Sequence, residues 1–145
     1  LDIGSRRELF VDRFLIGGLQ SGETVLLHGG GGGVNTAGIQ LCRHLISDAS
    51  IVVTASPAKL DRVRDQGANF VINYREQDFA GEVRRFTDQR GADVILDLVG
   101  GEYLEGNLTV QLNGQGLFEP LGGRLGKLHV ADAELVSGKS RENLV

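Results

Sequence analysis

The sequence is poor in the residues that mark several classes of protein. Its 145 residues include one cysteine, no tryptophan, no methionine and only two prolines. A single cysteine excludes an internal disulfide framework, and no Cys/His cluster suggests a metal site. No apolar run approaches the length of a membrane span, and the opening residues do not form a signal peptide, so we expect a cytoplasmic protein. The net charge of −4 comes without a basic block, which argues against a nucleic-acid partner.

Glycine, by contrast, is abundant and concentrated at one place. Five consecutive glycines, Gly29–Gly33, follow the apolar run Thr24–His28 and precede Val34–Leu41, whose apolar residues have helical spacing. A strand, a glycine turn and a helix in this order present helix amides to a phosphate, and the missing side chains let the backbone approach it. Gly30–Asn35 fits G-x-G-x-x-G with Asn35 in the last position. A flexible turn is the alternative, but the position between strand and helix favours a dinucleotide.

Apolar strands alternate with amphipathic helices along the rest of the chain. This order predicts an α/β fold, a single truncated domain with a Rossmann-like, doubly wound parallel sheet that binds its ligand beyond the carboxyl ends of the strands. We expect an N-terminal helix or extension at 1–16, the dinucleotide domain at 17–120, and a tail at 121–145 that no pattern assigns. Further strands are expected at 51–54, 70–73, 94–99 and 116–118, and further helices after Ser56-Pro57, around 79–86 and at 102–108.

The end of the second strand indicates which dinucleotide is bound. An NAD site usually has Asp or Glu there for the ribose 2′-hydroxyl, whereas this chain has Thr54, Ala55 and Ser56, with Lys59 one turn later. A hydroxyl and an ammonium suit a 2′-phosphate, which favours NADP(H). The alternative is that Ser56 is only a helix cap and Lys59 only a solvated charge. Tyr74, after the third strand, either covers the adenine end, bonds the 2′-phosphate or packs as a half-buried residue.

Other polar residues fit structural roles better than chemical ones. His28 is expected to be a hydrogen-bonded support at the strand end, Asp97 a structural acceptor and Cys42 a small buried residue. Gly100, after the fourth strand, either leaves room for the nicotinamide half of the cofactor or forms a plain turn. We therefore assign no catalytic and no metal-binding residue.

Several motifs in register resemble a known family. The runs GETVLLHGG at 22–30, GGV at 32–34, VINYRE at 71–76 and LDLVGG at 96–101 are similar to the cofactor domain of zinc-independent medium-chain dehydrogenases/reductases. The nearest branch is the zeta-crystallin-like quinone oxidoreductases, and the resemblance runs from about residue 17 to about 108. It implies NADPH bound at Gly32, Gly33 and Val34, with 2′-phosphate contacts from Ser56, Lys59 and Tyr74. It also implies metal-free hydride transfer to a quinone, enone or similar activated carbonyl.

Three departures from the family pattern shape the functional hypothesis. Asn35 replaces the third glycine and would either crowd the turn or hydrogen-bond a phosphate. The catalytic domain that precedes the cofactor domain in such enzymes is missing from these residues, and the tail after Leu108 lacks the later strands. We therefore expect an NADP(H)-binding domain that acts on a substrate only if a catalytic domain is supplied. A homo-oligomer is one possible assembly of the chain. A non-catalytic nucleotide-binding or interaction module is the alternative.

Overall fold

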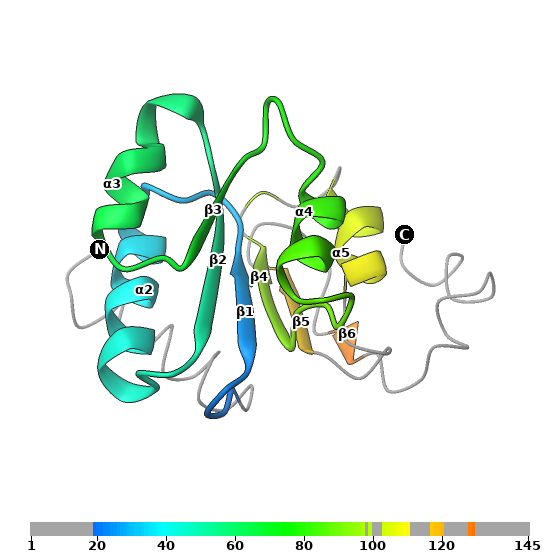
Figure 1. Ribbon diagram of the computed structural model, residues 1–145, viewed down its shortest axis with the longest axis horizontal. Coiled ribbons are helices and arrows are strands. Elements are labelled where there is room, and N and C mark those ends of the chain that lie inside the picture. Colours follow the sequence, from blue (N-terminus) through cyan, green and yellow to red (C-terminus); the bar gives the residue numbers. More distant parts are fainter. Residues whose placement is uncertain (1–18, 98, 100–102, 111–116, 121–127, 130–145) are drawn as a thin grey trace.

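The computed structural model describes residues 19–97, 99, 103–110, 117–120 and 128–129 (Figure 1). The expected N-terminal helix and Gly100 lie outside the described residues. The described elements, in chain order, are β1 (Thr24–Leu27), α2 (Gly33–Leu45), β2 (Ser50–Ala55), a 3₁₀ turn (Pro57–Lys59), α3 (Leu60–Asp65), β3 (Phe70–Asn73), α4 (Phe79–Phe86), β4 (Val94–Asp97), α5 (Leu104–Val110), β5 (Leu117–Pro120) and β6 (Leu128–His129).

Six strands of the described chain form one sheet in the order β3-β2-β1-β4-β5-β6. The pairs β1–β2, β2–β3, β1–β4 and β4–β5 are parallel, and β6 is antiparallel to β5. This is the doubly wound order expected from the sequence, and the order of the strands reverses at β1. The sheet continues beyond residue 120, because β6 pairs with β5. The strand expected at 116–118 is confirmed as β5, and with β6 after it, the expectation that the tail lacks the later strands is wrong.

Helices cover both faces of the sheet, with α2 and α3 on one side and α4 and α5 on the other (Figure 1). Successive residues of a strand point to opposite faces. Val25 and Leu27 of β1 therefore pack with Ile39 of α2, whereas Leu26 packs with Val83 of α4. All of these side chains are fully buried, and each contributes about 1.5–3 kcal/mol by leaving water. Strands buried on both faces are typical of a parallel sheet between two helix layers.

The helix boundaries follow local sequence signals. Asp78 caps α4 by accepting hydrogen bonds from the amides of Ala80 and Gly81, at 3.3 and 3.0 Å. Pro57 occupies the first position of its 3₁₀ turn, as expected from its fixed φ angle. The short helix expected at 102–108 is found slightly later, as α5.

Candidate cofactor site at the glycine turn

The glycine turn lies at the carboxyl end of β1, between the ends of β2 and β4. The His28 amide donates to the carbonyl oxygen of Leu96 at 3.0 Å, and the Gly30 amide donates to that of Thr54 at 2.7 Å. The backbone at the start of the turn is therefore fixed to both neighbouring strands. Ligands of open α/β sheets bind in the crevice at this reversal of strand order.

Two glycine positions of the turn have a clear physical requirement. A Cβ at Gly30 would lie 2.5 Å from Cγ1 of Val53, so only a residue without a side chain lets the turn pack against β2. Gly31 has φ of 90°, in the left-handed region that L side chains rarely adopt. Close packing and an unusual backbone conformation thus account for glycine at these two positions.

The first turn of α2 leaves its amides without a capping side chain. Its N-cap is Gly32, which has no side chain to accept a hydrogen bond, and the first turn contains no acidic residue. A helix N-terminus carries free amide donors and a partial positive charge of about half an elementary charge. The turn and the start of α2 together therefore suit an anionic group such as a pyrophosphate.

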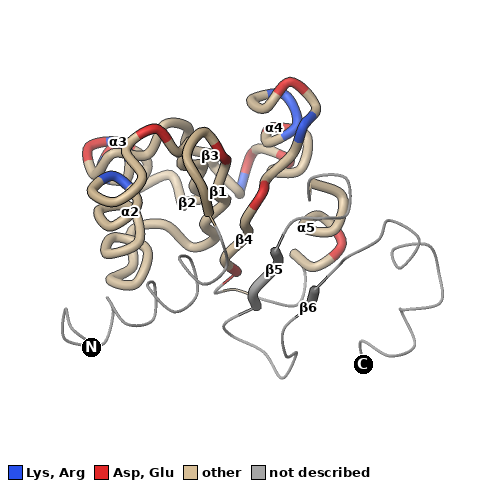
Figure 2. Tube along the Cα trace, turned by 90° about the horizontal axis from the view of Figure 1, so that it is seen from below, with Lys and Arg blue, Asp and Glu red and all other residues tan. Residues whose placement is uncertain are grey.

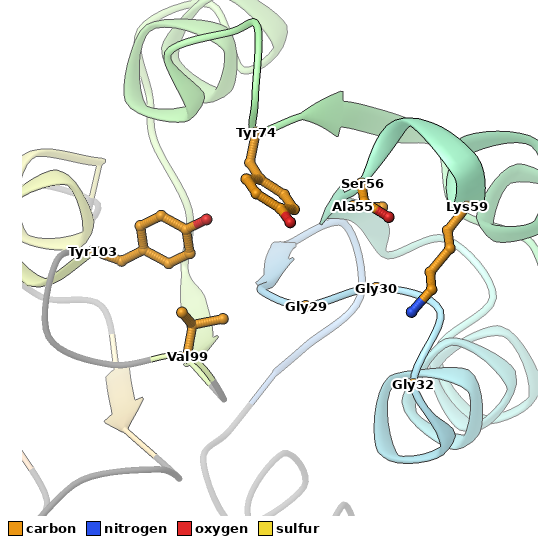
Figure 3. A pocket seen from close by; sticks show the side chains of 9 residues that line it. All are labelled: Gly29, Gly30, Gly32, Ala55, Ser56, Lys59, Tyr74, Val99 and Tyr103. Atoms are coloured by element: carbon orange, nitrogen blue, oxygen red, sulfur yellow. The ribbon is translucent and has the colours of Figure 1, made fainter.

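A cavity of about 300 Å³ opens beside this turn (Figure 3). Its walls come from the turn, from the end of β2 with the following 3₁₀ turn, from the residue after β3, and from the segment between β4 and α5. The lining residues are Gly29, Gly30, Gly32, Ala55, Ser56, Lys59, Tyr74, Val99 and Tyr103.

The charge of the lining favours an anion. Among the lining residues, Lys59 carries a charge and none carries a carboxylate. Lys59 is exposed. Its aliphatic stem packs against the glycine turn, where a Cβ on Gly31 would lie 2.5 Å from its Cδ. Ser56 precedes the 3₁₀ turn, but its hydroxyl makes no capping hydrogen bond. An ammonium and a hydroxyl thus lie at the same end of the cavity, both suited to a phosphate.

The structure brings together five of the eight residues that the sequence assigns to the cofactor: Gly30, Gly32, Ser56, Lys59 and Tyr74. Gly33 and Val34 form the first turn of α2 and do not line the cavity, and Val34 packs its side chain against the core. Gly100 lies outside the described residues. The sequence analysis missed four lining residues, Gly29, Ala55, Val99 and Tyr103. Of these, Gly29 belongs to the glycine run, Ala55 to the end of the second strand and Val99 to the LDLVGG run, whereas Tyr103 carried no sequence signal.

Asn35 has a role that neither sequence-based alternative anticipated. Its side chain is fully buried, and its Nδ2 donates to the carbonyl oxygen of His28 at 2.6 Å. It is not among the residues that line the cavity. Asn35 therefore holds α2 to the end of β1, rather than crowding the turn or presenting its amide to a phosphate.

The other polar residues have the structural roles expected of them. Both ring nitrogens of the buried His28 are hydrogen-bonded, and burial lowers the pKa of the imidazole. Asp97 accepts a hydrogen bond from the side chain of Asn107 at 3.0 Å. Cys42 is buried in α2, and desolvation raises the pKa of its thiol to about 11. A thiol that stays protonated is a poor nucleophile.

The described surface carries charges of both signs. Figure 2 shows acidic and basic residues interspersed around α4, where Glu82 pairs with Arg85 and Asp93 with Arg90. Within the described ranges, no group of three or more His, Cys, Asp or Glu side chains is placed to hold a metal ion. In the same residues, no helix is both long and apolar enough to cross a membrane.

The strand order and the turn with its cavity define a nucleotide-binding domain of the Rossmann type. Residues 33–128 match the family model described as zinc-binding dehydrogenase. The chain therefore belongs to this family, within the medium-chain dehydrogenase/reductase superfamily, as the sequence motifs implied.

Individual relatives agree with this assignment. Over 121 residues the chain is 36% identical to the phenolphthiocerol synthesis polyketide synthase type I Pks15/1 of Mycobacterium marinum, a match that covers 82% of this chain and 5% of that protein. The crystal structure of CurK enoyl reductase has a TM-score of 0.74 at 32% identity, and a quinone oxidoreductase of Pseudomonas syringae pv. Tomato DC3000 has a TM-score of 0.71 at 27% identity. Each structural match covers 82% of this chain and 35% of the other. The chain thus spans only a minor part of the length of these relatives.

Proposed function

We propose that the chain is the NADP(H)-binding part of a reductase that transfers hydride to a quinone, an enone or a similar activated carbonyl. The observation that carries the choice of NADP(H) is the lining of the cavity. Lys59 and Ser56 lie together beside the glycine turn, and none of the lining residues is acidic. A carboxylate would accept from a ribose 2′-hydroxyl and repel a 2′-phosphate, whereas a lysine and a serine attract the phosphate.

Different residues of the site would bind different parts of the cofactor. Amides of the glycine turn and of the first turn of α2, which includes Gly33 and Val34, would hold the pyrophosphate. Ser56 and Lys59 would bind the 2′-phosphate. Tyr74, an exposed residue that lines the cavity, would cover the adenine end. When bound, the nicotinamide supplies the hydride. The protein's own contribution is to bind and orient the cofactor at the end of β1.

The proposed acceptor rests on the similar proteins. An enoyl reductase and a quinone oxidoreductase share the fold, and their names describe redox enzymes that act on an enoyl group and on a quinone. An activated double bond or a quinone is therefore the class of acceptor that we assign. Because the chain spans 35% of each of these structures, the acceptor-binding residues are not assigned to it.

One observation favours a second candidate, a nucleotide-binding module without catalysis of its own. The lining of the cavity includes no His, Cys, Asp or Glu, the side chains that most often carry acid–base or nucleophilic chemistry. Oxidation of NADPH by 1,4-benzoquinone tests the second candidate in one direction, because saturable turnover with the acceptor would rule out a module without catalysis of its own.

A cofactor titration tests the proposal. NADP⁺ and NAD⁺ are titrated by calorimetry at one ionic strength against the wild type, Lys59→Ala and Arg62→Ala. Arg62 is a matched control, because it is an exposed cation close to Lys59 that does not line the cavity. We expect Lys59→Ala to weaken NADP⁺ binding by about 1 kcal/mol, roughly fivefold, and to leave NAD⁺ unchanged. Equal affinity of the wild type for both cofactors, or equal losses in the two variants, would refute the NADP(H) assignment.

A further inference from the structure

A chain of buried polar side chains lies beneath the glycine turn. Nδ1 of His28 lies 3.0 Å from Oγ1 of Thr54, and its Nε2 lies 2.6 Å from Oδ1 of Asn107. Nδ2 of Asn107 in turn donates to Oδ2 of Asp97 at 3.0 Å. The four side chains come from β2, the end of β1, α5 and β4, and all four residues are fully buried. Four separate elements are therefore joined by a single hydrogen-bonded path.

The two ends of this path reach two neighbouring segments of the cavity lining, since a Cβ on Gly29 would lie 3.7 Å from Cγ2 of Val99. At one end, Oγ1 of Thr54 accepts from the amide of Gly29 at 3.4 Å. At the other end, Oδ1 of Asp97 accepts from the amide of Val99 at 2.8 Å. Gly29 and Val99 both line the cavity, and Figure 3 shows them on different chain segments. The path thus connects the phosphate-binding turn with the wall contributed by the segment after β4.

Hydrogen-bond chemistry fixes the direction of the path. Asp97, as a carboxylate, can only accept, so the amide nitrogen of Asn107 faces it and the amide oxygen of Asn107 faces His28. Nε2 of His28 must therefore carry the proton, which leaves Nδ1 as an acceptor for the hydroxyl of Thr54. The hydroxyl oxygen then remains free to accept from Gly29. Only one neutral tautomer of His28 satisfies every step.

The surroundings of His28 favour this neutral form. Its ring packs edge-on against Phe79 of α4 and is tilted by 31° over Tyr103, with ring centroids 4.6 Å away in both cases. The titratable groups that face it are Asp97 of β4 and Tyr103 beside α5, whereas β2 presents the neutral Thr54 and α4 the apolar Phe79. Desolvation is the main cause that lowers the pKa of His28, and it opposes the weaker effects of Asn107 and Asp97. A protonated ring would donate from both nitrogens, so the hydroxyl of Thr54 would have to accept from Nδ1 and turn its own proton away from the ring.

We propose that His28 is a positioning residue of the cofactor site, which in its Nε2–H form holds the Gly29 turn and the Val99 wall in one fixed arrangement. This inference rests on the proposed function, since it assumes that the cavity binds a dinucleotide. A site whose two walls are fixed before binding loses less freedom when the ligand binds, and this raises affinity. His28 itself does not line the cavity and acts through Thr54 and Asn107.

The tautomer of His28 is tested by NMR on the whole chain with ¹⁵N-labelled histidine at neutral pH, without cofactor. We expect a protonated Nε2 and an unprotonated Nδ1 for this residue. A protonated Nδ1, or a charged ring, would overturn the proposed direction of the path. Because no ligand is needed, this result is independent of the proposed function.

A double-mutant cycle tests the positioning role. NADP⁺ affinity and the urea midpoint are measured for Thr54→Val, Asn107→Ala and the double variant, with Thr54→Ser as the control that keeps the hydroxyl. We expect each of the first two to weaken binding on the order of three- to tenfold, the equivalent of one net hydrogen bond. Thr54→Ser should bind like the wild type. Because both changes break the same path, the double variant should bind no more weakly than the weaker single variant.

Losses that multiply in the double variant would show that Thr54 and Asn107 act independently, and would overturn the positioning role. If the Asn107 variants fail to fold, Thr54→Val against Thr54→Ser decides, and equal affinities of the two would overturn it as well. Failure of the wild type to bind any dinucleotide would instead refute the proposed function. The NMR measurement would still establish whether the hydrogen-bonded path has the stated direction.

Discussion

Alanine at Gly30 is expected to destabilise the fold through a steric clash beneath the glycine turn. A Cβ at this position would lie 2.5 Å from Cγ1 of Val53, 3.1 Å from the carbonyl oxygen of Thr54 and 3.2 Å from Cγ2 of Val63. Carbon atoms in contact prefer a separation of about 3.5–4.0 Å, so the methyl group of Val53 would have to move by about 1 Å. Val53 and Val63 are fully buried in the core between the sheet and its helices, where little space is available.

The size of the effect follows from the cost of overpacking. Extra carbon atoms in a packed core typically cost 1–3 kcal/mol, and we expect Gly30→Ala to lose about 2 kcal/mol of unfolding free energy. With an m-value of about 2 kcal/mol per molar urea, the unfolding midpoint should fall by about 1 M. Circular dichroism during a urea titration measures this midpoint and shows whether the m-value is unchanged.

Gly32→Ala is the matched control, because the nearest atom to its added Cβ is the carbonyl oxygen of Gly29 at 3.7 Å. Its cost should stay below about 1 kcal/mol, the difference between glycine and alanine at an N-cap. A Gly30→Ala variant as stable as Gly32→Ala would refute the packing argument. The glycine at position 30 would then require another explanation, such as contact with a ligand.

Four further outcomes are expected. Arg43→Lys should lose about 1–3 kcal/mol of stability in the same urea assay, because the guanidinium of Arg43 donates to the carbonyl oxygens of Gly67, Ser47 and Ala49 at 2.8–3.1 Å and to the side chain of Asn69. Cys42 should react with a thiol reagent only after unfolding, since its pKa is raised to about 11, and rapid modification of the native chain would contradict its burial. Burial lowers the pKa of His28 from 6.5, so below that pH the unfolded chain binds one more proton than the folded chain. The free energy of unfolding should therefore fall on acidification by up to about 1.4 kcal/mol per pH unit. His28→Gln should remove this pH dependence. The chain of 145 residues alone should reduce quinones and enones at far less than about 1 turnover per second. Hydride transfer needs the acceptor held about 3–3.5 Å from the nicotinamide, and no acceptor-binding residue is assigned to this chain. Saturable turnover above that rate would overturn this expectation.

Local patterns predicted the elements of the sheet well. The β-branched run at β2 and the apolar run at β3 gave these strands almost to the residue, because strands buried on both faces are continuously apolar. The alternation of strands and helices then gave the doubly wound order, since crossover connections allow few topologies. Of the last two strands, β5 was expected at 116–118 and β6 was not. The strand β6 has two residues, Leu128–His129, too few for a periodicity to be recognised.

The sequence indicated only lining residues that lie within a few positions after the end of a strand. Gly30, Ser56 and Tyr74 were found because they follow β1, β2 and β3, and the ends of parallel strands lie along one edge of the sheet. Tyr103 lacks such a signal, and it reaches the cavity only through the packing of its segment beside His28. Asn107 lies 79 residues after His28, so their hydrogen bond depends on tertiary structure that no local pattern encodes.

The central position of β1 has a consequence for the order in which the chain folds. His28 meets Thr54 across 26 residues of chain, whereas the amide of Thr24 meets the carboxylate of Asp93 across 69. Closing the longer loop costs about 0.9 kcal/mol more entropy, and contacts between distant residues slow folding. We therefore expect β1, β2 and β3 to assemble first and β4 to add later, with its own helix. The half of the cavity lined by the glycine turn and by Ser56 and Lys59 would then form during synthesis, before the wall that contains Val99 and Tyr103 exists.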